Sequence, residues 1–189
     1  AKHYADAIEA KIGHYAPHPT HMNFIEVSQG FSLGINSGFY PFTTSRECTV
    51  MQALSDANIH PEMYCGSIMV VRTFPIRVAG NSGPCYPDQQ ELTWEYLGVE
   101  PEITTVTKKV RRVFSWSDMQ FCAALEANRP DVVFVNFCNY LQNLGADVEA
   151  FVLEHVYSNY VRVMGRMPKA VLLGFGPKTS DVKVFEMPQ

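Results

Sequence analysis

The sequence predicts a single domain of the α/β class, in which helices flank a largely parallel sheet. Short apolar runs rich in β-branched residues alternate with longer amphipathic stretches, and no linker or low-complexity segment divides the 189 residues. The chain is 47% hydrophobic and 18% charged, a composition that can bury a substantial core. Residues 1–189 are therefore expected to fold as one unit.

The first part of the chain is expected to hold two helices and a strand around a glycine-rich loop. Apolar residues spaced as on one helix face predict a helix over residues 4–12. A compact apolar run predicts a buried strand over residues 23–27. Residues 28–45 predict a packed loop, because glycines recur between aromatic side chains and let the backbone approach a ligand closely. Residues 49–58 predict a second helix.

The middle of the chain is expected to begin with a central strand. Residues 63–72 are apolar and β-branched and predict that strand, while residues 77–84 predict a turn-rich loop. A helix is predicted over residues 88–97, because Asp88 is a favourable N-cap and Glu91 completes a capping-box pattern.

The remainder of the chain alternates between helix and strand signals. Residues 101–112 are polar and rich in threonine and predict a loop, and a serine cap begins a helix over residues 117–126. An apolar run predicts a buried strand over residues 131–135, and helical periodicity predicts a long amphipathic helix over residues 148–164. Residues 169–174 predict a last strand.

Charge and targeting signals exclude several classes of function. The net charge of −4 and the isoelectric point near 5.8 do not suit electrostatic binding to nucleic acid or to a membrane surface. No apolar run approaches the roughly 18 residues of a membrane span, and the first residues lack the apolar core of a signal peptide. Five cysteines without metal or redox spacing indicate free thiols in a reducing cytoplasm.

The histidines give one weak indication of a metal site. His14, His18 and His21 lie close together in the sequence, but Pro17 and Pro19 break the helix that would align them. We therefore expect no metal ligands in this chain.

Four loops follow or flank predicted strands, where α/β folds place their ligands: residues 28–45, 77–84, 104–112 and 136–139. Their amides and hydroxyls, together with the basic run Lys108–Arg112, suit a carboxylate or a phosphate. No spacing indicates a nucleophile paired with a base, although side chains distant in sequence can still meet in space.

These loops carry motifs in an order that resembles the adenylosuccinate synthetases. Residues 26–45, with Gln-Gly followed by Gly-Phe-Tyr-Pro-Phe-Thr-Thr-Ser, resemble the family's Gly-Ala-Gln-Gly … Gly-Thr-Tyr-Pro-x-Val-Thr-Ser. Residues 77–87 resemble Thr-Arg-Val-Gly-x-Gly-Pro-Phe-Pro, and residues 173–177 resemble the C-terminal Ser-Val-Gly-Pro. Residues 102–118 resemble Glu-x-Gly-x-Thr-Thr-Gly-Arg-x-Arg-Arg-x-Gly-Trp-x-Asp.

The resemblance implies half of a P-loop-type ligase fold and a role for particular residues. A pocket for a purine monophosphate would be lined by Gln29, Leu33, Thr44 and Val78, with Thr44 touching the phosphate. A loop that closes on aspartate would comprise Val106, Thr107, Lys109 and Arg111. The base of a nucleoside triphosphate would lie among Asn136, Asn139, Gly174, Gly176 and Pro177. A purely structural role in the core accounts equally well for Leu33 and Val78.

The family's phosphate loop, Gly-Asp-Glu-Gly-Lys-Gly-Lys, has no counterpart in this sequence. In the family it carries the catalytic aspartate, and a catalytic histidine lies beyond it in the same N-terminal half. The resemblance therefore implies that residues 1–189 correspond to the C-terminal half, that a separate N-terminal half supplies the general acid and base, and that the ligands of Mg²⁺ lie there too. A truncated, non-catalytic module that binds a nucleotide or a partner is the alternative.

Two departures from the family pattern bear on the substrates. The guanine-reading Thr-Lys-x-Asp is here Asn136-Phe137-Cys138-Asn139. An amide suits the N1/N6 edge of adenine better than the two donors of guanine, so ATP is expected rather than GTP, with Phe137 stacking near the base. Lys109 stands where arginine is usual and offers a point charge in place of a bidentate fork.

The short chain, the Thr-Thr-Val-Thr run and the lost guanine reader resemble the archaeal-like branch of the family, which includes bacteriophage enzymes. The implied function is a phage-type ligase that uses ATP, dGMP and L-aspartate to make 2-amino-2'-deoxyadenylosuccinate. Ordinary adenylosuccinate synthesis from IMP stays open. The resemblance also implies a homodimer in the host cytoplasm, with small-molecule substrates and neither nucleic acid nor membrane as a partner.

Overall fold

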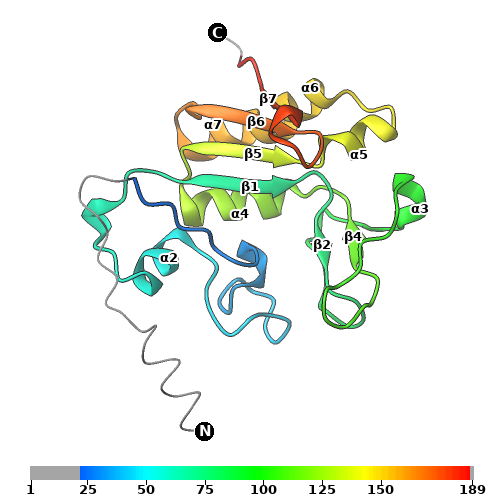
Figure 1. Cartoon of the computed structure of the whole chain (residues 1–189), viewed down its shortest axis with the longest axis horizontal. Coiled ribbons are helices and arrows are strands. Elements are labelled where there is room, and N and C mark those ends of the chain that lie inside the picture. The colour runs from blue at the N-terminus through cyan, green and yellow to red at the C-terminus, as the bar shows by residue number, and fades with distance from the viewer. Residues whose placement is uncertain (1–21, 188–189) are drawn as a thin grey trace, which may run out of the picture.

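The computed structural model describes residues 22–187 of the chain (Figure 1). The helix expected over residues 4–12 and the histidines His14, His18 and His21 lie outside the described residues.

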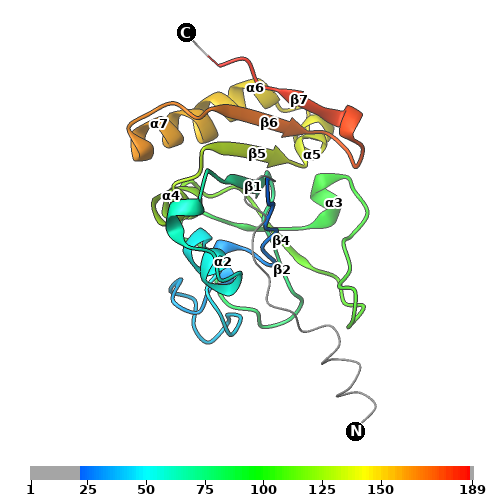
Figure 2. The same ribbon diagram turned by 60° about the vertical axis from the view of Figure 1, so that its left-hand side comes forward.

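The main sheet confirms the predicted fold class. Its strands are β1 (Ile68–Arg72), β5 (Val132–Asn136), β6 (Ala170–Gly174) and β7 (Val182–Val184), in the spatial order β1-β5-β6-β7. β1, β5 and β6 run parallel, and β7 pairs with β6 in the antiparallel sense. Figure 2 shows the four strands side by side in this order.

Helices cover one face of this sheet. They are α4 (Asp118–Asn128) and a continuous helix made of α6 (Val148–Phe151), a π-helical segment (Val152–Tyr157) and α7 (Ser158–Met164). The prediction of a long helix over residues 148–164 is thus confirmed. Burial of each large apolar side chain contributes about 1.5–3 kcal/mol, so this layer dominates the stability of the domain. The shared core comprises Phe121, Leu125, Val133, Val135, Val152, Val156, Tyr160, Met164, Val171 and Leu173.

The opposite face of the main sheet is open among residues 22–187. Ile68, Val70 and Val184 are 54%, 60% and 69% exposed. The register places Val70 beside Phe134, which in turn lies beside Leu172, so an apolar band crosses three strands. Parallel sheets usually carry cover on both faces, and this face has none from the described residues.

A smaller antiparallel sheet lies beyond the carboxyl end of β1 (Figure 1). Its strands are β2 (Ile76–Arg77), β4 (Arg112–Phe114) and β3 (Glu91–Leu92), in the order β2-β4-β3, and α3 (Trp94–Leu97) follows β3. The sequence did not predict this sheet, because strands of two or three residues are too short to show an alternating pattern.

The helix predicted over residues 88–97 is wrong in its first half. Only α3 is helical, and its N-cap is Thr93. The Asp88 carboxylate instead accepts hydrogen bonds from the Ser117 hydroxyl at 2.6 Å and from the Met119 backbone N–H at 3.0 Å, at the start of α4. Asp88 is therefore a capping residue, but it caps a helix distant in the sequence.

The strand predicted over residues 23–27 is also wrong. These residues pair with no strand among those described, and Phe24 is 83% exposed. β1 begins at Ile68, later than predicted, because a 3-10 turn (η2, Pro61–Met63) and Gly66 with φ 146° precede it. Neither segment has the backbone of a strand.

The remaining elements agree with the sequence, with two additions. α2 (Val50–Asp56) begins after its N-cap Thr49, and 3-10 turns occur at η1 (Phe31–Leu33) and η4 (Thr179–Asp181). The additions are the strand β7 and the helix α5 (Cys138–Asn143). α5 follows β5 directly and has no side-chain N-cap that would indicate it in the sequence.

Candidate functional site

The carboxyl ends of β1, β5 and β6 bring together three residues from distant parts of the chain. Arg72 and Asn136 are register partners at the ends of β1 and β5, and Gly174 ends β6 beside them. A Cβ atom at Gly174 would lie 2.5 Å from Asn136 Oδ1 and 2.9 Å from the Phe134 ring. Only glycine therefore lets these strand ends pack as they do, and the predicted neighbours Asn136 and Gly174 do meet.

The strand-end turn, residues 136–139, links β5 to α5. Phe137 has φ 64°, in the left-handed region, and its N–H donates to Asn136 Oδ1 at 2.9 Å. The Thr73 hydroxyl donates to the Phe137 carbonyl at 2.8 Å. These bonds fix the turn and set half-buried Asn139 in the first turn of α5.

The last two predicted nucleotide residues, Gly176 and Pro177, lie in the loop after β6. A Cβ at Gly176 would lie 2.5 Å from Asp181 Oδ2, which accepts a hydrogen bond from the Lys178 N–H at 3.0 Å. Phe175 N–H donates to the Asp181 carbonyl at 3.0 Å. This loop therefore folds tightly on itself at the same end of the sheet as the strand-end turn.

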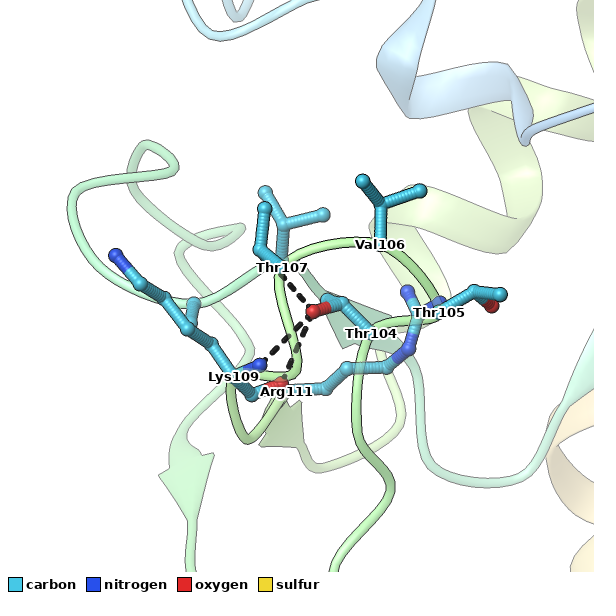
Figure 3. A pocket seen from close by; sticks show the side chains of 8 residues that line it. Thr104, Thr105, Val106, Thr107, Lys109 and Arg111 are labelled. Carbon is cyan, nitrogen blue, oxygen red and sulfur yellow. Dashed lines mark hydrogen bonds between the residues drawn. The ribbon is translucent and has the colours of Figure 1, made fainter.

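The threonine loop, residues 104–111, projects from the smaller sheet and is organised by one buried side chain. The hydroxyls of Thr104 and Thr107 share a hydrogen bond of 2.6 Å, and the Lys109 N–H donates to Thr104 Oγ1 at 3.0 Å (Figure 3). At the stem, the Arg111 N–H donates to the Glu102 carbonyl at 2.8 Å. Lys108 has φ 53°, at the position where the resembling motif has glycine.

The threonine loop and the loop after β2 line a hollow of about 490 Å³ that is open to solvent. Its lining is Val78, Ala79, Thr104, Thr105, Val106, Thr107, Lys109 and Arg111. All four residues predicted to bind aspartate thus lie together, beside one predicted to bind the purine. Lys109 and Arg111 extend to opposite sides of the loop (Figure 3). The lining contains two cations and no acid, so it suits an anion.

The other residues predicted to bind the purine monophosphate lie in the glycine-rich loop. The Thr44 N–H donates to the Leu33 carbonyl at 2.8 Å. The Cys48 thiol donates to Gln29 Oε1 at 3.8 Å. Thr44 and Leu33 are thus joined to each other and Gln29 to Cys48, whereas Val78 lines the hollow and is 55% exposed. A core role is therefore excluded for Val78, while Leu33 is half-buried.

Arg77 joins the glycine-rich loop to the hollow. Its guanidinium donates to the carbonyls of Phe42 at 3.0 Å and Pro84 at 2.9 Å. A Cβ at Gly83 would lie 2.8 Å from Phe42, so the two loops are packed closely. Burial, followed by the nearby Arg112, lowers the pKa of Arg77.

Four residues near the strand ends escaped the sequence-based prediction. Arg72, Glu102 and Tyr140 form one cluster with Phe137, and the indole N–H of buried Trp94 donates to the Arg111 carbonyl at 2.7 Å. No motif could have linked Arg72 to Glu102, because these residues lie on different elements that only the fold brings together.

The cysteines and the acids offer no further chemistry at this site. All five thiols are free, and burial raises the pKa of the Cys138 thiol to about 11, so it stays protonated. Within residues 22–187, no group of three or more His, Cys, Asp and Glu side chains is placed to hold a metal ion. No helix in the same range is long and apolar enough to cross a membrane.

A parallel sheet whose strand ends carry a close-packed amide–glycine turn, beside a cationic threonine loop, is typical of α/β proteins that bind nucleotides and small anions. The model of the family described as adenylosuccinate synthetase matches residues 11–146, more than half of the chain. The chain belongs to the adenylosuccinate synthetase family.

Curated phage proteins share much of this sequence. The chain is 48% identical over 169 residues to the N6-succino-2-amino-2'-deoxyadenylate synthase of Salmonella phage PMBT28, covering 84% of this chain and 46% of that protein. It is 48% identical over 162 residues to the enzyme of the same name from Vibrio phage phiVC8, covering 85% and 46%. An adenylosuccinate synthetase of Archaeoglobus fulgidus is 38% identical over 92 residues, 49% of this chain and 26% of that protein. The chain thus spans about half the length of these phage relatives.

Two solved structures share the fold. The cyanophage S-2L succinoaminodeoxyadenylate synthetase, bound to dGMP and to dATP as an energy donor, superposes with a TM-score of 0.71 at 35% identity, over 85% of this chain and 45% of that one. The adenylosuccinate synthetase of Plasmodium falciparum superposes with a TM-score of 0.60 at 18% identity, over 85% and 49%, and supports the fold alone.

Proposed function

We propose that this chain forms the substrate-binding part of a phage-type ligase. The ligase joins L-aspartate to dGMP at the expense of ATP and makes 2-amino-2'-deoxyadenylosuccinate. Support comes from the 48% identity to two phage synthases of that product class, and from a relative of similar fold that was solved with dGMP and dATP.

The observation that carries the proposal is the composition of the hollow. Val78, predicted to contact the purine, lines the same 490 Å³ space as Lys109 and Arg111, predicted to hold aspartate. A reaction between the amine of aspartate and the purine ring needs both substrates to be bound next to each other in one site. One space with both kinds of lining residue meets that requirement.

In the proposed reaction the triphosphate phosphorylates the purine 6-oxygen, and the amine of aspartate then displaces that phosphate. Lys109 and Arg111 extend to opposite sides of the threonine loop, so both reach the carboxylates of aspartate, together with the hydroxyl of Thr107, once the loop has closed on this ligand. The carboxylates are thereby fixed and the amine is turned toward the ring. Holding two reactants in register supplies several kcal/mol, up to roughly 7–11, of the barrier lowering in such reactions. The purine monophosphate is gripped by Gln29, Leu33 and Thr44.

The triphosphate base is assigned to the strand-end turn and the loop after β6. Asn136 and Asn139 present amides, and Gly174, Gly176 and Pro177 allow close backbone approach. An amide offers both a donor and an acceptor to the N1/N6 edge of adenine, so ATP is preferred to GTP. The dATP named for the cyanophage structure agrees with this preference.

Several partners are proposed from the family alone. Within residues 22–187, no group of three or more His, Cys, Asp and Glu side chains is placed to hold the Mg²⁺ that such ligases use. A homodimer and a place in the host cytoplasm follow from the family and from the phage origin of the relatives.

The test uses the complete natural protein with Mg²⁺, L-aspartate and one nucleotide of each kind. Phosphate release and product mass are followed with dGMP or IMP as acceptor and with ATP or GTP as donor. We expect turnover at least about tenfold faster with dGMP and ATP, a difference of about 1.4 kcal/mol. Turnover with IMP but not with dGMP would support the proposed ligase activity and would show that its acceptor is IMP. No turnover with any pair, together with nucleotide binding, would favour a non-catalytic binding module.

A further inference from the structure

We infer that Arg72 is a positioning residue that couples the threonine loop to the strand-end turn, so that binding of the triphosphate base and binding of aspartate favour each other. The inference rests on the proposed function. It concerns the coupling cluster, defined as Arg72, Glu102, Phe137 and Tyr140, of which only Phe137 was expected from the sequence to have a role, stacking near the base.

One side of the coupling cluster holds the stem of the threonine loop. The Glu102 carbonyl accepts the Arg111 N–H at 2.8 Å, which closes the loop at its base. The carboxylate of the same residue accepts from Arg72 Nη2 and, at 3.4 Å, from the Tyr140 hydroxyl. The position of the loop stem is therefore set by groups on β1 and α5.

The other side of the coupling cluster holds the strand-end turn. The Arg72 guanidinium carbon lies 3.6 Å from the centroid of the Phe137 ring, a close cation–π contact. Phe137 lies next to Asn136 in sequence and two residues before Asn139, and its ring packs 5.2 Å from that of Tyr140. Any shift of the turn on binding a base therefore moves the surface on which Arg72 rests.

The guanidinium has little freedom to respond by itself. Its Nε donates to the Phe74 carbonyl at 3.3 Å while Nη2 pairs with Glu102 and the plane stacks on Phe137. The side chains of Arg72 and Glu102 are only 22% and 27% exposed, so water competes weakly for the pair. Burial and the nearby Glu102 raise the pKa of Tyr140, which keeps its hydroxyl as a donor.

These contacts form an unbroken chain between two ligand sites. A base that settles against the strand-end turn fixes Phe137, which fixes Arg72, which fixes Glu102 and the stem of the threonine loop. Part of the conformational entropy that the threonine loop loses on binding aspartate is therefore already lost when the base is bound, so aspartate binds more tightly. By linkage, aspartate strengthens ATP binding by the same factor.

The chain contains a matched control at the other end of the sheet. Arg166 also pairs with a carboxylate, Asp131 at 3.6 Å, donates to a carbonyl, Pro130 at 3.1 Å, and lies over an aromatic ring, Tyr160 at 5.8 Å. It therefore loses the same kinds of contact as Arg72 when replaced by methionine, but far from either proposed ligand.

The test measures the affinity of a non-hydrolysable ATP analogue by calorimetry in the complete natural protein, with dGMP present, without and with saturating L-aspartate, so that no turnover adds to the heat of binding. We expect aspartate to tighten ATP binding by about 5-fold or more, within the usual range of site-to-site coupling. Arg72→Met should bring this factor to within about twofold of unity, Arg72→Lys should restore part of it, and Arg166→Met should leave it unchanged. Tyr140→Phe, which keeps the ring and removes one hydroxyl, should lower it partially and decides the matter if Arg72→Met does not fold.

The outcomes separate this inference from the proposed function. Undiminished coupling in the Arg72 and Tyr140 variants, or no coupling in the natural protein despite binding of both ligands, overturns the inference alone. Equal loss in Arg166→Met also overturns it, because general destabilisation would then be the cause. Failure of the natural protein to bind ATP and aspartate overturns both.

Discussion

The strand-end turn and the threonine loop are built in opposite ways. The turn is fixed by the left-handed Phe137, by hydrogen bonds from its own backbone, and by strand ends that meet Gly174 too closely for any other residue. The threonine loop has a single buried member, Thr104, and its tip residue Val106 is 89% exposed. The difference indicates that the backbone of the strand-end turn is more nearly preformed than the threonine loop, which is ordered fully only by its ligand.

The largest effect is expected from filling the space at the strand ends. Gly174→Ala places a methyl group 2.5 Å from Asn136 Oδ1, so we expect a loss of about 1–3 kcal/mol in the free energy of unfolding. Thermal unfolding should show a fall in Tm of several degrees, about 2–4 °C per kcal/mol. Gly30→Ala is the control, because a Cβ there meets no atom within 4 Å and φ is −142°. Equal Tm values for the two variants would mean that the turn is not rigid.

The next effect tests the ligand side of the threonine loop. Arg111→Leu removes one of the two cations of the hollow, so we expect the KM for aspartate to rise by an order of magnitude or more, about 1.4 kcal/mol. The KM for ATP, measured at saturating aspartate, should change little. Steady-state kinetics of the complete natural protein measure both, with Arg166→Leu as a distant control. An unchanged KM for aspartate would remove Arg111 from the site.

A smaller effect is expected from loosening the loop without touching its charges. Thr104→Val removes the hydroxyl that bonds to Thr107 and Lys109, which is worth about 0.5–1.5 kcal/mol. We expect the KM for aspartate to rise by about 3- to 10-fold, because the free loop samples more conformations. Thr104→Ser keeps the hydroxyl and should restore the natural value. A serine variant as weak as the valine variant would assign the effect to the methyl group instead.

The smallest effect concerns the sheet beneath the loop. The Glu91 carboxylate accepts from Arg112 Nε at 2.8 Å and Nη2 at 2.6 Å, and this hydrogen bonding lowers the pKa of Glu91. A lowered folded-state pKa gives stability that is present above the unfolded value of about 4.5 and is lost as pH falls through the folded value. Because Glu91 is largely exposed, Glu91→Gln should cost only about 0.5 kcal/mol at pH 7.

The pH dependence supplies the check on that last prediction. Below pH 4.5 the difference in Tm between the natural protein and Glu91→Gln should shrink and then vanish. A constant difference from pH 7 to pH 3 would show that the pair contributes through packing rather than charge.

The long periodic elements were predictable, whereas the contacts that arrange the site were not. The helix over residues 148–164 follows from its periodicity, because it is long enough to show the pattern, and the strand over residues 131–135 follows from its continuous apolar run. The helix predicted over residues 88–97 was wrong because Asp88, a favourable N-cap residue, caps the distant helix α4 rather than a helix that follows it in the sequence. The strand predicted at residues 23–27 failed because apolar composition cannot supply a pairing partner.

The motif residues proposed for the site could be selected because their order along the chain matches the family pattern, and the structure gathers four of them with Val78 around one hollow. Arg72 was not, because its contacts to Glu102 and Phe137 exist only once β1, β5 and the threonine loop are assembled. The tight fit of Gly174 against Asn136 was equally hidden, since the two residues lie on neighbouring strands but far apart in the chain.

The π-helical segment Val152–Tyr157 has a consequence for variation in chain length. A π turn contains one residue more than an α turn, and the helical segments on either side of it still present the same side chains to the sheet. Deleting one residue within it converts that turn to α geometry, and Val148 and Tyr160 still point at the sheet. The same deletion inside α4 would rotate everything after it by about 100° and expose Leu125. Insertions and deletions among relatives should therefore gather at residues 152–157 and avoid α4.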